Sequence, residues 1–241
     1  MNRIIYMVLR NIYRVPFWFY QLCRLCRADD PHTEEERYEF LHRLVKEVNR
    51  TGRVKVNCFG AEKLPEKNGF ILFPNHQGLF DSLALIESCP RPFGIVIKKE
   101  ALKWILVKQV VALLRGIGID REDIRASLEV IKQVTNEVRQ GRNYIIFPEG
   151  TRSREENEVL PFKAGTFKSA VNAKCPIVPV ALIDCYRPFD LSSIRRESVQ
   201  VHFLDPLYPE MYTGLKTKEI AEMVHDQIQE EINRNRRDGN N

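Results

Sequence analysis

The segment Phe73-Pro-Asn-His-Gln-Gly-Leu-Phe-Asp-Ser-Leu83 follows a short apolar run, residues 70–73, that is typical of a buried strand. It brings His76 and Asp81 to the start of a predicted helix. In an extended chain these two residues would be roughly 17 Å apart, so they can meet only if the chain turns back. Three residues have the chemistry of such a turn: Pro74, Asn75 and Gly78. The sequence therefore predicts a strand, a turn and a helix start that hold an imidazole beside a carboxylate.

The chemistry of this pair depends on the contact between the two side chains. A carboxylate bound to one imidazole nitrogen fixes the tautomer of the ring and stabilises its protonated form. His76 is then a candidate general base for a hydroxyl group, with Asp81 as its orienting partner. The alternative is that Asp81 only caps a helix and His76 is a surface loop residue. An isolated pair at this spacing is more often of the second kind, so other motifs have to decide between them.

Composition and charge limit the possible functions. At 241 residues the chain is long enough for one substantial α/β domain with a small extension. The net charge is +5, and residues 1–27 contain five arginines and no acidic residue, so the charges of the remaining chain cancel. Nucleic-acid binding is therefore a poor fit. The six cysteines include one isolated Cys-x-x-Cys pair and are expected to be reduced thiols in a cytoplasmic compartment.

The first 50 residues form a distinct basic and aromatic segment. Four of them are predicted to line one face of a helix whose other face is apolar and aromatic: Arg3, Arg10, Arg14 and Gln21. The longest uncharged run, residues 15–23, is too short to span a bilayer, and Pro16 should bend or restart the helix. Thr33 and Glu36 form a capping box that begins a second helix. We expect residues 1–50 to be a two-helix hairpin that docks on an anionic membrane surface, at the cytoplasmic face. The alternative is a helix that packs on the domain.

Residues 51–241 are expected to form the main domain. Short apolar runs alternate there with longer helical patterns, which predicts an α/β fold with a mostly parallel sheet. The predicted strands are Val54–Val56, Phe70–Phe73, Gly94–Ile97, Tyr144–Phe147, Ile177–Ile183 and Val199–Phe203. The predicted helices are Ser82–Ser88, Ala101–Arg115, Asp123–Gln140 and Lys218–Arg234. The second of these helices is apolar nearly all round, so it is either buried, beside an acyl chain, or in contact with lipid.

Three further segments carry polar groups that could bind an anion. Gly116-Ile-Gly-Ile-Asp-Arg121 ends with a guanidinium suited to phosphate or carboxylate, although a glycine at a helix end followed by arginine is common. Phe147-Pro-Glu-Gly-Thr-Arg-Ser153 follows a strand at the sheet edge where open α/β folds bind ligands. It could equally hold a structural Glu–Arg pair. In Phe162-Lys-Ala-Gly-Thr-Phe-Lys168, backbone amides could hold an anion, but a plain helix start with solvated lysines is favoured.

The order of these segments resembles a known family. Asn75-His76-x4-Asp81, Gly118-Ile-Asp-Arg121, Phe147-Pro-Glu-Gly-Thr-Arg152 and Pro176-Ile-Val-Pro179 are similar to the four sequence blocks of the glycerolipid acyltransferases, most closely the bacterial 1-acyl-sn-glycerol-3-phosphate acyltransferases. The resemblance covers roughly residues 50–210. It implies helices around a central sheet, often after an N-terminal two-helix membrane-docking element. It also implies that His76 is the base, that Asp81 orients it, and that six residues form the acceptor site: Lys98, Arg121, Glu149, Gly150, Thr151 and Arg152.

The resemblance implies an enzyme that transfers a fatty acyl group from acyl-CoA or acyl carrier protein. The acceptor would be the sn-2 hydroxyl of lysophosphatidic acid, and the product phosphatidic acid. We expect no metal or other cofactor, because no cluster has ligand spacing, and no covalent serine, because no Gly-x-Ser-x-Gly motif occurs. Two alternatives remain. One is an acyltransferase for another lysophospholipid or for glycerol 3-phosphate, and the other is a non-catalytic protein that binds anionic lipid.

Overall fold

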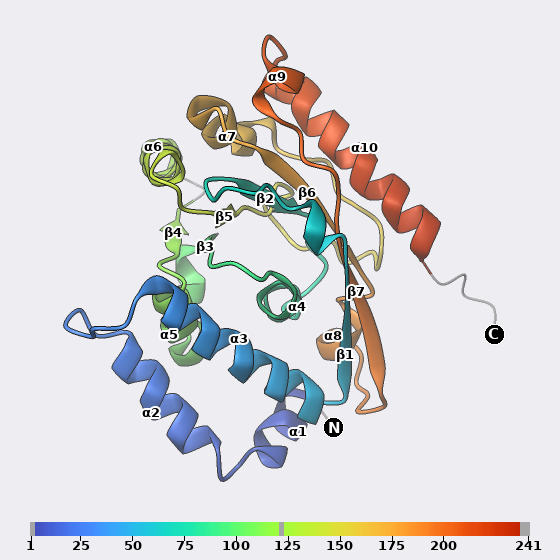
Figure 1. The fold of residues 1–241 in the computed structure, drawn as a ribbon. Coiled ribbons are helices and arrows are strands. Elements are labelled where there is room, and N and C mark those ends of the chain that lie inside the picture. The colour runs from blue at the N-terminus through green and yellow to red at the C-terminus, as the bar shows by residue number, and fades with distance from the viewer. Residues whose placement is uncertain (1–2, 121–122, 237–241) are drawn as a thin grey trace.

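A twisted seven-stranded sheet forms the centre of the computed structural model, which describes residues 3–120 and 123–236 (Figure 1). The strands are β1 (Val54–Phe59), β2 (Ile71–Pro74), β3 (Gly94–Lys98), β4 (Ile117–Ile119), β5 (Tyr144–Ile145), β6 (Ile177–Ile183) and β7 (Glu197–Phe203). Their order across the sheet is β1-β7-β6-β2-β5-β3-β4. Neighbours are parallel except β6 and β7, which pair antiparallel. The carboxyl ends of β2, β3 and β5 therefore meet at one edge of the sheet.

Helices cover both faces of the sheet (Figure 1). The helices are α1 (Arg3–Arg10), α2 (Val15–Leu25), α3 (Glu34–Thr51), α4 (Asp81–Ser88), α5 (Ile105–Leu113), α6 (Ile124–Arg139), α7 (Lys168–Ala173), α8 (Arg187–Asp190), α9 (Pro209–Tyr212) and α10 (Thr217–Asn235). Helices α3, α4 and α5 pack on one face, and α6, α7 and α10 on the other. Alternate side chains of β2 enter the two cores: Leu72 one, and Ile71 and Phe73 the other. Burial on both faces explains why the central strands are apolar throughout.

Most predicted elements are present, but one strand was missed and one helix is shorter than predicted. The α/β class and the mostly parallel sheet are confirmed. The strand β4 was read only as part of a glycine-containing loop, because three residues between polar neighbours give no strand signal. It forms by pairing with β3 at the sheet edge. The predicted helix Ala101–Arg115 is wrong at its start: a 3-10 turn spans Lys99–Lys103, and α5 begins only after Trp104, whose backbone is extended.

The N-terminal segment folds as three helices that share the core of the domain. Helix α1 ends at Arg10 and α2 begins at Val15 with Pro16 in its first turn, so the chain restarts a helix where proline predicted it. The capping box of Thr33 and Glu36 at the start of α3 is confirmed. Apolar side chains from α1, α2 and α3 enter the same cluster as the sheet, while the opposite sides of α1 and α2 are exposed. In the part of the chain that the structure describes, no helix combines the length and the apolar character needed to cross a bilayer.

The predicted basic face of the first helix is not formed, because Arg3 is buried. Its guanidinium donates hydrogen bonds to three backbone carbonyls, those of Gly52, Pro188 and Arg195, at 2.7–2.9 Å. Glu197 lies 3.8 Å away and supplies the opposite charge. A buried guanidinium needs such partners. Arg3 therefore links the start of α1 to the end of α3 and to the segment that precedes β7.

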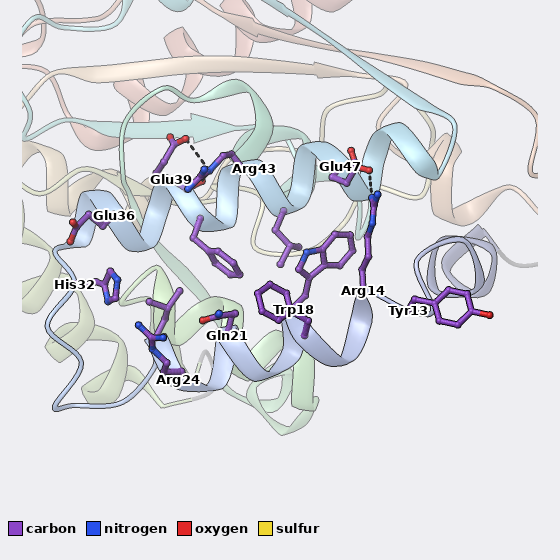
Figure 2. Close-up of a pocket in the computed structure, with 14 residues that line it drawn as sticks. Tyr13, Arg14, Trp18, Gln21, Arg24, His32, Glu36, Glu39, Arg43 and Glu47 are labelled. Atoms are coloured by element: carbon purple, nitrogen blue, oxygen red, sulfur yellow. Dashed lines mark hydrogen bonds and ion pairs between the residues drawn. The ribbon is translucent and has the colours of Figure 1, made fainter.

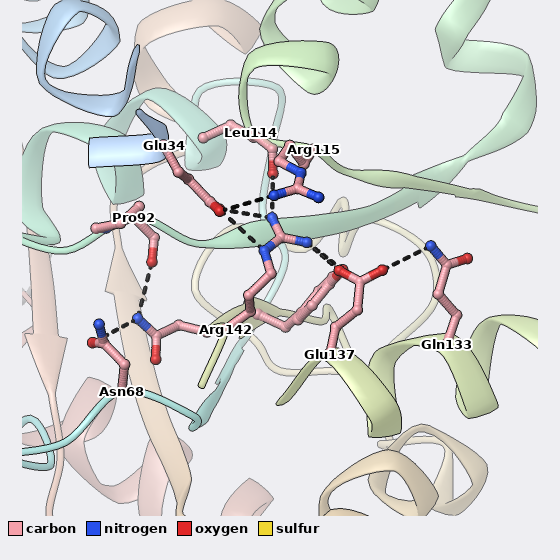
Figure 3. A network of polar contacts seen from close by, with 10 residues as sticks. Glu34, Asn68, Pro92, Leu114, Arg115, Gln133, Glu137 and Arg142 are labelled. Carbon is pink, nitrogen blue, oxygen red and sulfur yellow. Dashed lines mark hydrogen bonds and ion pairs between the residues drawn. The ribbon is translucent and has the colours of Figure 1, made fainter. Parts of the chain in front are cut away.

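The other end of α3 is fastened by Arg142, which lies between α6 and β5 (Figure 3). Its guanidinium donates two hydrogen bonds to Glu34 in the first turn of α3, at 2.8 and 3.1 Å. It also pairs with Glu137 of α6 and donates to the hydroxyl of Tyr144 at 3.0 Å. Both ends of α3 are thus held by arginines that contact distant parts of the chain.

Replacing Arg142 by methionine should lower the free energy of unfolding by about 2 kcal/mol, because two partly buried carboxylates, Glu34 and Glu137, lose the guanidinium that they share. Urea denaturation followed by far-UV circular dichroism measures this change. The matched control is Arg43→Met on α3, where the exposed pair with Glu39 contributes no more than ~0.5 kcal/mol. Equal effects of the two substitutions would contradict a role of Arg142 in attaching α3.

Candidate active site

The loop between β2 and α4 brings His76 onto Asp81. Pro74 ends the strand, the chain reverses over residues 75–80, and Asp81 opens the helix. The Nδ1 of His76 lies 2.7 Å from Oδ2 of Asp81. The predicted turn and the predicted contact between the two side chains are therefore present.

The carboxylate of Asp81 is fully buried and its position is fixed by the backbone. The same oxygen, Oδ2, accepts hydrogen bonds from the N–H groups of Gln77 at 2.7 Å and Gly78 at 3.0 Å. Because Oδ2 is the acceptor in both of these hydrogen bonds, Nδ1 of His76 is assigned as the donor in the third. The lone pair of the neutral ring is then on Nε2. This is the tautomer that a general base needs.

The residues on either side of His76 bind the loop to the end of β6. Asn75 pairs with Leu182 as a strand would: its Oδ1 accepts from the backbone N–H at 2.7 Å, and its Nδ2 donates to the carbonyl at 3.0 Å. Gln77 accepts from the N–H of Cys185 at 2.7 Å and donates to Asn157 at 2.7 Å. These contacts prevent rotation of the loop, so the imidazole keeps one orientation.

The segment Phe147–Ser153 holds His76 from the other side. The ring of His76 stacks on Phe147, with ring centroids 4.1 Å apart. The backbone carbonyl of His76 accepts from the N–H of Ser153 at 2.7 Å, and its backbone N–H donates to Oε1 of Glu149 at 2.7 Å. His76 and Glu149, which are 73 residues apart in the sequence, therefore bring two motifs together around the imidazole.

Glu149 was predicted on the acceptor site, but the structure places its side chain beneath His76, where it is 2% exposed. It does not line the cleft described below. Burial raises the pKa of Glu149 to about 8, against the opposing effect of hydrogen bonds from the backbone of His76 and Leu160. Glu149 therefore supports the loop that carries His76.

The ring of His76 faces a cleft of about 550 Å³ at the carboxyl ends of β3 and β5. Four predicted acceptor residues line this cleft: Lys98, Gly150, Thr151 and Arg152. Lys98 lies 3.7 Å from Glu100, whereas Arg152 has no hydrogen bond or ion pair with the residues that the structure describes. Arg121 lies outside the described residues, although its neighbour Asp120 lines the same cleft. The cleft thus combines an imidazole with a guanidinium that is available for an anion.

Lys163, for which the sequence favours a solvated side chain, also reaches this region. Gly150 has φ +74°, and a Cβ placed there would lie 2.8 Å from the ammonium of Lys163. The backbone N–H of Lys163 donates to the carbonyl of Pro148 at 2.9 Å, which holds the two loops together. No local pattern marks this approach, because it depends on contact between segments 15 residues apart.

A second, apolar pocket of about 250 Å³ adjoins the cleft. The two hollows share three lining residues: Val96, Phe147 and Gly150. The rest of the pocket wall is formed mainly by aliphatic side chains of α6 and by residues 163–169. An apolar chain attached to a group in the cleft could enter it.

A larger groove, of about 1000 Å³, lies between α2 and α3 (Figure 2). Its floor is apolar, and its rim carries both arginines and glutamates, including the ion pairs Arg14–Glu47 and Arg43–Glu39. It shares no residue with the cleft of His76. Size alone therefore does not identify the site.

An α/β sheet with a His–Asp pair and a free guanidinium at its carboxyl edge fits an enzyme that activates a hydroxyl beside an anion. The model of the Acyltransferase family matches residues 55–183, more than half of the chain, so the protein belongs to this family. Two curated relatives are named 1-acyl-sn-glycerol-3-phosphate acyltransferase. That of Borreliella burgdorferi is 29% identical over 177 residues, 73% of this chain and 70% of the relative. That of Escherichia coli is 29% identical over 181 residues, 74% of this chain and 73% of the relative.

The crystal structure of the 1-acyl-sn-glycerophosphate (LPA) acyltransferase PlsC from Thermotoga maritima has the same fold. It matches with a TM-score of 0.75 and 21% sequence identity, over 97% of each chain.

Substituting Glu149 by glutamine should change how stability depends on pH. The unfolded carboxyl loses its proton near pH 4.5, whereas the folded one keeps it to about pH 8. The folded state therefore binds more protons between these values, and wild-type stability should fall as pH rises, by as much as ~4 kcal/mol. Glu149→Gln removes the titrating group, so the free energy of unfolding should depend less on pH. Urea denaturation of both proteins from pH 5 to pH 9 measures the difference, and parallel curves would contradict a buried, neutral Glu149.

Proposed function

We propose that the protein transfers a fatty acyl group from a thioester to the sn-2 hydroxyl of lysophosphatidic acid, giving phosphatidic acid. The observation that carries the proposal is the 2.7 Å contact of His76 with a buried, backbone-bound Asp81 at the wall of a cleft with a free guanidinium. The names of the relatives support the choice of acceptor.

In the proposed mechanism, Nε2 of His76 removes the proton of the acceptor hydroxyl as its oxygen attacks the thioester carbonyl. The imidazolium is stabilised by the carboxylate of Asp81. The tetrahedral intermediate then collapses, the carbon–sulfur bond breaks, and the proton passes from His76 to the departing thiolate. The products are the new ester and the free thiol, and the imidazole is neutral again. Acyl-CoA or acyl carrier protein is the donor.

The acceptor phosphate is assigned to the charged part of the cleft. Among the described residues Arg152 has no hydrogen-bond or ion-pair partner, Lys98 lines the same cleft, and the ammonium of Lys163 lies close to Gly150. The sequence resemblance to the acyltransferases adds Arg121 as a further proposed ligand of the phosphate. A planar guanidinium can bind two phosphate oxygens at once, which would fix the distance from the phosphate to the reacting hydroxyl.

A fatty acyl chain is assigned to the apolar pocket beside the cleft. The pocket is lined by Val130, Ile131 and Val134 and opens where Phe147 stacks on His76. The carbonyl at the end of such a chain would lie close to the imidazole. The walls of the pocket would then exclude water from the thioester.

The protein is further proposed to work as a peripheral protein at the cytoplasmic face of a membrane. Large apolar side chains on the outer side of α1 and α2 are exposed, including Ile5 at 54%, Phe17 at 59% and Tyr20 at 64%. Exposed apolar and aromatic side chains on short helices are typical of segments that lie in a bilayer surface. The inner sides of both helices pack on the domain, so their outer sides would form a rigid membrane-binding surface.

Changing His76 to alanine should lower turnover by about 10²- to 10⁴-fold, because the base is lost while the substrate contacts remain. Purified protein is assayed with an acyl-CoA and lysophosphatidic acid, with products measured by mass spectrometry. The matched control is His225→Ala, since His225 also lies beside an acid, Asp226 at 3.0 Å, but on α10 away from the cleft. A lipid-binding protein without catalytic function would show the same properties before and after the change.

The same assay separates the possible acceptors. Lysophosphatidic acid, other lysophospholipids and glycerol 3-phosphate are offered in turn with one acyl donor. Preferred acylation of lysophosphatidic acid supports the proposal, and preferred acylation of another acceptor contradicts it.

Filling the apolar pocket should change the preferred donor. Ile131→Trp places a large ring in the pocket, so kcat/KM for long acyl chains should fall about 10-fold or more relative to short ones. The control is Leu128→Trp on the outer side of the same helix, where the side chain is 44% exposed and does not line the pocket. An unchanged chain-length profile for Ile131→Trp would show that the acyl chain lies elsewhere.

A further inference from the structure

A second exposed apolar patch lies beside the cleft, at the start of α5. Three consecutive large side chains are exposed there: Trp104 at 58%, Ile105 at 68% and Leu106 at 59%. Trp104 also lines the cleft of His76. We call residues 99–108, which surround these side chains, the rim segment. Adjacent exposed apolar side chains of this size are unusual on a surface that meets only water.

The rim segment carries positive charge without partners. Lys99, Lys103 and Lys108 are exposed, and none forms an ion pair or a hydrogen bond with the side chains of described residues. The acidic residue in the segment, Glu100, lies beside Lys98. The rim segment thus presents an apolar centre with unpaired ammonium groups on both sides.

The arginines of the N-terminal helices differ in this respect. Four of the five have an acidic partner: Arg3 with Glu197, Arg14 with Glu47 (Figure 2), Arg24 with Asp30 and Arg27 with Asp29. The positive charge predicted for residues 1–27 is therefore largely neutralised within the protein. Arg10, the fifth arginine, has no ion pair with the described residues, so the N-terminal helices keep one unpaired cation where the rim segment has three.

We propose that the rim segment is a membrane contact in its own right, made for a bilayer that contains anionic lipid. Trp104, Ile105 and Leu106 enter the boundary between headgroups and acyl chains, where tryptophan is favoured. Lys103 and Lys108 extend to the lipid phosphates. The inference rests on the proposed function, because it places the mouth of the cleft on the membrane. A lysophospholipid could then present its hydroxyl to His76 while its chain stays close to the bilayer.

The rim segment also adjoins the surface already assigned to the membrane. Helix α5 packs against α2, where the thiol of Cys26 lies 3.3 Å from the carbonyl oxygen of Gln109. Gln109 is one turn beyond Ile105 on α5. An acidic acyl carrier protein could also bind lysines, but three adjacent exposed apolar side chains that include tryptophan favour a bilayer.

Vesicle co-sedimentation of the full chain tests the proposal, with phosphatidylcholine vesicles that contain or lack phosphatidylserine. Lys103→Gln/Lys108→Gln should weaken binding to the anionic vesicles by about 10- to 30-fold and leave binding to neutral vesicles unchanged. Ile105→Ser/Leu106→Ser should weaken binding to both by about 10-fold or more. None of these four residues lines the cleft.

Matched controls use the opposite edge of the sheet. Lys67→Gln/Lys174→Gln removes the same charge from exposed positions before β2 and β6, and Met211→Ser removes an apolar side chain that is 57% exposed. Both should bind as wild type does.

Activity separates this proposal from the proposed function. The rim variants should acylate a water-soluble, short-chain lysophosphatidic acid at the wild-type rate but lose rate on acceptor held in vesicles. If both rim variants bind vesicles as the wild type does, the proposal is wrong, and α1 and α2 would be the membrane-binding surface. An effect confined to KM for an acyl carrier protein donor also overturns it. A wild-type protein without acyl transfer to any acceptor would contradict the proposed function, and the vesicle-binding results would still stand.

Discussion

One buried carboxylate oxygen determines the geometry of the site. Oδ2 of Asp81 accepts hydrogen bonds from His76, Gln77 and Gly78, and these three donors can converge only if the chain reverses between β2 and α4. Hydrogen bonds to an ionised acceptor are stronger than those between neutral groups, and burial removes competing water. The reversal therefore places the imidazole at the sheet edge where the other polar segments also end.

Two carboxyl groups support the same histidine, and burial raises the pKa of one of them, Glu149. Asp81 accepts several hydrogen bonds and acts as the anion beside Nδ1. Glu149 is buried with few polar neighbours, and the charge of Asp81 raises its pKa further. If both were ionised, their negative charges would repel each other beside His76. A neutral Glu149 can hold the backbone of His76 without this cost.

The sequence predicted those parts of the fold and site that depend on local chemistry. Alternating apolar runs identified the central strands, turn residues identified the reversal before Asp81, and Thr33 with Glu36 identified the start of α3. Features that depend on contacts between distant segments were missed or wrong. Burial of Arg3 depends on carbonyls of residues 52, 188 and 195, and the approach of Lys163 to Gly150 depends on two loops packing together. Strand β4 forms only through its parallel pairing with β3.

The contacts of Arg3 and Arg142 have a consequence for the exposed apolar surface of α1 and α2. Apolar side chains that face water lower their free energy by packing inward, so helices that expose them need to be held by other contacts. Arg3 binds the carbonyl after the last turn of α3, and Arg142 binds the carboxylate in its first turn. Charged contacts at both ends of α3 fix the register of the N-terminal helices, because a shifted arrangement would leave a buried guanidinium without acceptors. The contacts of Arg3 and Arg142 thereby keep the apolar side chains of α1 and α2 exposed on the surface, where they are accessible to a membrane.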